Sequence, residues 1–125
     1  MKTLITFAAC LLAAVGIQAQ QVAGNASYTN ALTVYNAPLK LQCVTGYNSA
    51  STRQFVQVFN TVTGATNGAV PTFSFPVPPT NYFSLDFSSY GANLDKCKVC
   101  VSSNANSLAL TAATVSIQAV FKSPQ

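Results

Sequence analysis

The residues most capable of chemistry lie in one short stretch, Asp95-Lys-Cys-Lys-Val-Cys100. Two cysteines at this spacing can form a redox pair or supply half of a zinc site. A structural zinc site needs four cysteine or histidine ligands, and the chain has no histidine. A thioredoxin-type pair needs its first thiol at a helix N-terminus, whereas the residues from Cys97 onward alternate like a strand. We therefore expect no metal site. A redox role remains an alternative because flanking lysines would favour a thiolate.

Other catalytic groups are scarce. The chain has no histidine, and Asp86 and Asp95 are its only acidic side chains. General acid–base catalysis usually needs a histidine or a pair of carboxylates, and a serine nucleophile needs a neighbouring base. Asp86 falls on the polar side of a strand pattern and Asp95 stands next to a lysine, so both are expected to be solvated surface groups. We predict that the protein is not an enzyme and uses no cofactor.

The cysteines could still be structural. In a strand, Cys97 and Cys100 would point to opposite faces with Cα atoms roughly 10 Å apart, beyond the limit of about 7 Å for a disulfide. Cys43 continues an inward row with Leu39 and Leu41, and Cys97 begins another inward row. The sequence therefore predicts a Cys43–Cys97 disulfide with Cys100 as a free thiol. A Cys43–Cys100 bridge is the alternative if the strand phase shifts by one residue.

The N-terminus has the layout of a secretory signal peptide. A basic start is followed by the apolar run Leu4 to Val15 and by small residues up to Ala19. The run is too short to span a bilayer, which takes roughly 20 residues. We expect residues 1–19 to be cleaved, which leaves no membrane span and an exported protein in the periplasm, on the cell surface or outside the cell. Residues 20–30 are small and polar and are expected to form a flexible arm.

Residues 31–125 are expected to form one all-β domain. Apolar and polar residues alternate with the period of a half-buried strand in most segments. Residues 54–60 are apolar on both sides, as a central strand would be. Turn residues separate these segments, including Asn67-Gly68, a strong hairpin signal. The expected strands cover residues 31–35, 39–44, 54–60, 72–77, 82–87, 97–102 and 113–122.

Six or seven short strands of this kind favour a single antiparallel β-sandwich or jelly-roll-like domain. Pro71 and Pro76 bracket one strand and indicate an edge position for it. The net charge of the whole chain is only +4, and the basic residues form no run. Nucleic-acid binding by a basic patch is therefore not expected.

Motifs in the middle of the chain resemble another group of proteins. Gln54-Phe-Val-Gln-Val-Phe-Asn60 leads through Gly68-Ala-Val-Pro71 and Phe75-Pro-Val-Pro78 to Tyr82-Phe-Ser-Leu-Asp-Phe87, Tyr90-Gly91 and Val99-Cys-Val-Ser-Ser103. This order is similar to small all-β structural proteins of tailed bacteriophages over about residues 39–103. The resemblance implies a β-sandwich or jelly-roll-like unit in a virion, with no catalytic residues. The apparent leader departs from the pattern, because such proteins usually start without one.

Two functions follow as hypotheses. The first is a non-catalytic structural or interaction module with protein partners or self-assembly, resembling a virion or surface-assembly subunit. The second is a secreted binding module for a glycan or host-surface ligand, with Tyr47, Tyr82 and Tyr90 near loops as candidate contacts.

Overall fold

The structure is a computed structural model that describes residues 20–88 and 90–123, without the side chains of Asn25 and Ala26. The expected signal peptide lies outside these residues. The described part forms strands and no helix, which confirms the all-β prediction, and it therefore holds no helix that could cross a membrane. The strands are β1 (Gln21–Thr29), β2 (Ala31–Tyr35), β3 (Leu39–Asn48), β4 (Gln54–Phe59), β5 (Phe73–Val77), β6 (Asn81–Asp86), β7 (Ala92–Leu94), β8 (Cys97–Ser102) and β9 (Val115–Lys122).

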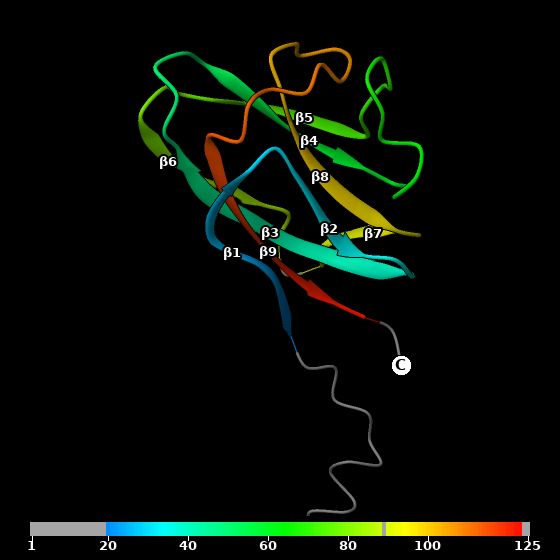
Figure 1. Ribbon diagram of the computed structural model, residues 1–125. Coiled ribbons are helices and arrows are strands. Elements are labelled where there is room, and N and C mark those ends of the chain that lie inside the picture. The colour runs from blue at the N-terminus through cyan, green and yellow to red at the C-terminus, as the bar shows by residue number, and fades with distance from the viewer. Residues whose placement is uncertain (1–19, 89, 124–125) are drawn as a thin grey trace, which may run out of the picture.

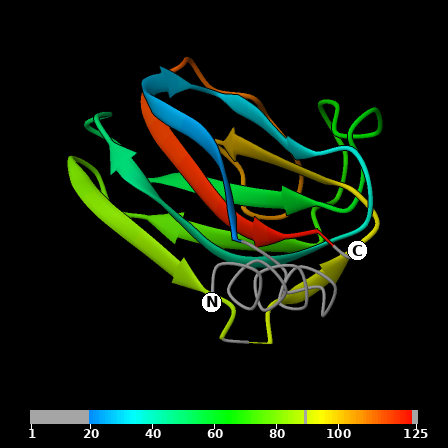
Figure 2. The same ribbon diagram turned by 90° about the horizontal axis from the view of Figure 1, so that it is seen from below.

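The strands form two antiparallel sheets that pack face to face (Figures 1 and 2). Sheet A has the order β1-β9-β3-β6, with the short β7 also paired to β3, and sheet B has the order β2-β8-β4-β5. Strands β1 to β4 thus pair with β9, β8, β6 and β5 respectively, like one long hairpin rolled into a sandwich. This is the strand order of a jelly roll, and the predicted fold class is confirmed.

Side-chain alternation explains the core between the sheets. In β9, the odd-numbered residues from Val115 to Phe121 are buried, and Gln118 between them is exposed. β4 and β8 are buried along almost their whole length, as expected for central strands covered on both faces. The core consists of Val34, Leu39, Leu41, Val44, Val56, Val58, Val77, Phe83, Leu94, Cys97, Val99, Val101, Val115, Ile117, Ala119 and Phe121.

A β-bulge in β3 reverses the expected direction of its side chains. The register with β9 shifts between Leu41 and Cys43, so β3 contains one extra residue at this point. The side chains that follow it point to the opposite face of the sheet from the one expected. Val44, rather than Cys43, is fully buried in the core. The prediction of an inward-facing Cys43 was therefore wrong, because strict alternation does not survive an inserted residue.

Residues 20–30 are not the expected flexible arm. Gln21–Thr29 is β1, which pairs with β9 from Gln21↔Phe121 to Thr29↔Val115. The open edge of β9 supplies backbone partners to a segment whose own side chains bury little surface, so backbone pairing overrides its polar composition. A small irregularity between Asn25 and Tyr28, preceded by Gly24 at φ +91°, lets the strand bend.

The edge position of β5 is confirmed, whereas the tight hairpin at Asn67-Gly68 is not. β5 carries Pro76 and lies at an edge of sheet B, as predicted. Asn67-Gly68 lies between β4 and β5, and Gly68 has φ +92°. The connection is a long loop over residues 60–72 rather than a tight hairpin turn.

The substitution Gly46→Ala tests the packing of β3. A Cβ at this position would overlap the Ser116 carbonyl oxygen and lie 2.8 Å from the Phe83 ring. We expect a loss of about 1–3 kcal/mol in the free energy of unfolding, measured by urea denaturation. Thr45→Ala, on the outer side of the same strand, is the control and should cost less. Equal effects of the two substitutions would contradict the described packing.

Candidate functional site

The C-x-x-C thiols lie on opposite sides of sheet B. Cys97 belongs to the core between the sheets, whereas Cys100 packs with Phe59 and Leu108 on the outer side. Burial raises the pKa of Cys97 from 9.0 to about 12, with a smaller contribution from Cys100. Burial also raises the pKa of Cys100, against a lowering effect of Lys98. Both thiols are therefore protonated and inaccessible, the opposite of a reactive redox pair.

The expected Cys43–Cys97 disulfide is absent from the structure. Cys43, Cys97 and Cys100 are all free. Cys43 lies in sheet A and is turned to the outer face by the bulge, while Cys97 points into the core from sheet B. Cys100, which the sequence predicts to be a free thiol, is buried with Phe59, Ala65 and Leu108.

The outer face of sheet B is closed by the chain itself. The loops over residues 60–72 and 103–111 cover it, at the top of Figure 1 in green and orange. Gly68 N donates to the Leu108 carbonyl at 2.7 Å, and Leu108 N donates to the Ala69 carbonyl at 2.8 Å. Ala65 and Leu108 of these loops are buried against Phe59 and Cys100 of the sheet. These bonds join the two loops into one cover.

Buried polar side chains hold the second loop in place. Gln57, fully buried on β4, donates from Nε2 to the carbonyl oxygens of Asn104 at 2.7 Å and Ala105 at 3.3 Å. Ser102 Oγ accepts from Asn104 N at 3.0 Å and from Ala109 N at 2.9 Å. Sequence reasoning missed this arrangement. The signal was a glutamine in the middle of an otherwise apolar strand, which must find hydrogen-bond partners once buried.

The outer face of sheet A, by contrast, carries an open polar groove. Its volume is about 450 Å³. Gln20 Nε2 donates to Gln42 Oε1 at 2.6 Å, and both residues belong to its lining. The groove is lined by Gln20, Gln42, Cys43, Ser84, Asp86, Ser88, Val120 and Lys122. Amide, hydroxyl, carboxylate and ammonium groups thus converge on a surface that no other described segment of the chain covers.

An aromatic pair stands on the same face. The register of β3 and β6 places Tyr47 directly opposite Tyr82, and their ring centroids are 4.7 Å apart with planes at 56°. Tyr82 is 78% exposed. Tyr90, the third predicted contact, is 83% exposed in the connection between β6 and β7 and is not part of this pair. None of the three tyrosines lines the groove itself. The structure therefore unites two of the three candidate tyrosines.

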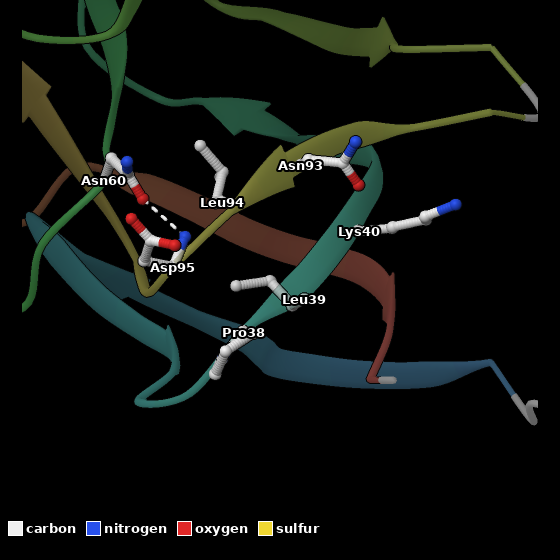
Figure 3. Close-up of a pocket in the computed structure, with 7 residues that line it drawn as sticks. All are labelled: Pro38, Leu39, Lys40, Asn60, Asn93, Leu94 and Asp95. Carbon is white, nitrogen blue, oxygen red and sulfur yellow. Dashed lines mark hydrogen bonds between the residues drawn. The ribbon is translucent and has the colours of Figure 1, made fainter. Parts of the chain in front are cut away.

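The second acidic residue, Asp95, does not line this groove. Asp95 lines a smaller pocket of about 240 Å³ with Pro38, Leu39, Lys40, Asn60, Asn93 and Leu94 (Figure 3). Asn60 Oδ1 accepts from Asp95 N at 2.6 Å and from Lys96 N at 3.4 Å. Asn60 thereby fixes the turn that leads into β8. Asp86 and Asp95 line separate pockets, so the structure does not assemble them into a pair of catalytic carboxylates.

Thiol labelling tests these assignments. At pH 8, a pKa of about 12 leaves roughly one Cys97 thiol in ten thousand ionised. We expect iodoacetamide to modify Cys43 in the native protein, and Cys97 and Cys100 only after denaturation, as read by peptide mass mapping. Rapid native labelling of Cys97 would contradict its placement in the core.

Comparisons with known proteins find a likeness among solved structures alone. No family model and no curated protein matches the chain. Among solved structures, the chain is similar to the coat protein of Tobacco streak virus in a structure of its dimer, with 11% identity, 86% of this chain and 87% of that chain covered, and a TM-score of 0.49. The same coat protein in a C2 crystal form gives 13% identity, the same coverage and a TM-score of 0.44. Neither is a tailed-bacteriophage protein, and no family membership follows from this likeness.

Proposed function

We propose that this protein is a non-catalytic structural module that assembles with partner proteins through the outer face of sheet A. The observation that carries the proposal is the asymmetry between the two sheets. The chain covers the outer face of sheet B with its own loops. The outer face of sheet A keeps an open groove and an exposed aromatic pair.

The chemistry of this face suits a protein contact. Tyrosine is enriched at interfaces because it combines a large apolar area with a hydrogen-bonding hydroxyl. Most groove residues are uncharged, and Asp86 and Lys122 are its two charged members. Such a face forms hydrogen bonds with a complementary surface and does not steer a strongly charged ligand such as nucleic acid.

We also propose what kind of assembly this is and where it is located. Jelly rolls occur in viral capsid proteins and in lectins, so the fold alone does not choose between them. The motif order from Gln54 to Ser103 resembles tailed-bacteriophage structural proteins and supports a virion or surface-assembly subunit. An apparent leader over residues 1–19 supports export to the periplasm, the cell surface or the medium.

Assembly can be tested with one charged substitution on the proposed face. Gln118 is exposed on β9, so Gln118→Arg places a cation in the middle of the outer face of sheet A. We expect at least about a tenfold loss of the large assembled fraction in density gradients of culture material. Thr63→Arg, on an exposed loop over sheet B, is the control and should assemble normally. A wild-type chain that sediments only as a monomer, free of particles, would overturn the proposal.

The same face also supports a second candidate function, the binding of a glycan. A groove with amides, a carboxylate and a neighbouring tyrosine pair also suits a neutral glycan, whose sugar faces stack on aromatic rings and whose hydroxyls need hydrogen-bonding partners. Under this alternative, Tyr82→Ala lowers binding on a glycan array at least about tenfold. Tyr90→Ala is the control because Tyr90 is similarly exposed but is not part of the Tyr47–Tyr82 pair. An array without any bound glycan would dismiss this candidate.

A further inference from the structure

The edges of the two sheets are not equally protected against pairing with another strand. β1 and β2 are each interrupted by a register shift, β1 between Asn25 and Tyr28 and β2 between Thr33 and Tyr35. β5 carries Pro76, which cannot donate a backbone hydrogen bond. β7 spans only three residues. Bulges, prolines and short strands are the usual devices that block edge-to-edge association.

β6 has none of these devices. It pairs with β3 from Asn48↔Asn81 to Cys43↔Asp86 without a register shift, and it contains no proline. Phe87 N, just after β6, donates to the Gln42 carbonyl of β3 at 2.9 Å. Alternate residues of an antiparallel strand turn their backbone groups to the same side. Tyr82, Ser84 and Asp86 therefore direct their N–H and C=O groups away from β3, toward the open edge.

We propose that β6 of one copy pairs antiparallel with β6 of a second copy, with Ser84 opposite Ser84 on the twofold axis. This inference deepens the proposed assembly function and rests on it. The register places Tyr82 of each copy opposite Asp86 of the other, and it uses the outward groups of all three residues. A shift of two residues toward Asp86 on each strand would place the two carboxylates opposite one another, which is unfavourable. The register centred on Ser84 is thus the one in which Tyr82, Ser84 and Asp86 of both strands all pair with one another.

In a single copy, two side chains already accept hydrogen bonds from backbone N–H groups at or next to this edge. Asn81 Oδ1 accepts from Tyr82 N at 2.8 Å, and Asp86 Oδ1 accepts from Ser88 N at 2.9 Å. A carbonyl of the second copy replaces the Asn81 side chain at Tyr82 N, so pairing exchanges one hydrogen bond for another at this position. Ser84 has no such local cap on its N–H among the described hydrogen bonds, and it marks the centre of the proposed ladder.

Pairing would join two five-stranded sheets into one continuous sheet. The outer faces of both copies would then lie side by side, with Ser84 and Asp86 of each groove next to the junction. A partner on the outer face would meet two grooves and two tyrosine pairs at once. The dimer therefore provides a bivalent surface, which strengthens attachment without new contacts in either copy.

Substitutions at Ser84 test the edge. Ser84→Pro removes the central N–H, and Ser84→Lys places two like charges opposite one another across the twofold axis. Ser84→Ala is the matched control because it keeps the backbone donor. In sedimentation equilibrium of the full chain, we expect the dimer dissociation constant to rise at least about tenfold for the Pro and Lys variants and to stay within about threefold of wild type for Ser84→Ala. Far-UV circular dichroism identifies any variant that fails to fold, and the Lys variant, which leaves the backbone unchanged, then decides the result.

Cross-linking gives a positive readout. Directly opposite residues in a hydrogen-bonded antiparallel pair have Cα atoms about 5.5 Å apart, within the range that a disulfide bridges. The Ser84→Cys variant should therefore form a disulfide between the two copies through the introduced thiols on mild oxidation, mapped by mass spectrometry. Gln118→Cys, exposed in the middle of the outer face, should not.

The outcomes separate the two proposals. A dimer that survives Ser84→Lys, with no linkage through position 84, overturns edge pairing but leaves assembly through another surface in place. A wild-type chain that stays monomeric and free of particles overturns both. A dimer that is lost with Ser84→Lys and kept with Gln118→Arg supports the edge as the site of pairing.

Discussion

The bulge in β3 is the constraint on which the rest of the molecule depends. One extra residue between Leu41 and Cys43 changes which side of sheet A each later residue occupies. It sends Val44 into the core and brings Gly46 beneath the Phe83 ring, where a side chain would not fit. It also turns Cys43 and Tyr47 outward, so that the groove gains a thiol and Tyr82 gains an aromatic neighbour.

The polar cover of sheet B makes the two faces of the protein different. A glutamine in a central strand is costly unless its amide is hydrogen-bonded, and Gln57 finds carbonyl partners in the 103–111 loop. The loop in turn buries Leu108 and Cys100. The loop therefore pairs the Gln57 Nε2 group and buries apolar side chains at the same place, while Gln57 Oε1 has no hydrogen-bond partner in the described part of the protein. The outer face of sheet B is therefore occupied by the chain itself, whereas the outer face of sheet A stays open.

The edge strands of the two sheets differ in their protection against pairing with another strand, which fits the proposed assembly. Register shifts interrupt two edge strands and a proline lies in a third, while β6 keeps a continuous register. An unprotected edge exposes backbone donors and acceptors that are best satisfied by another strand. The edge lies next to the open groove, so pairing of copies and binding on the outer face would use adjacent parts of one surface.

The sequence by itself determined the all-β class, the locations of most strands and the edge position of β5. These depend on local alternation and on proline, which act within a few residues. Local pattern could not reveal the bulge in β3, because an inserted residue is identified only by its pairing with β9. It also could not reveal that residues 21–29 complete sheet A, since their backbone groups are satisfied by a strand about ninety residues away in the chain. The meeting of Tyr47 with Tyr82 and the burial of Cys100 under two loops likewise depend on long-range register. Only the tertiary structure decides such contacts, because each requires two distant segments to be placed before either side chain has a neighbour.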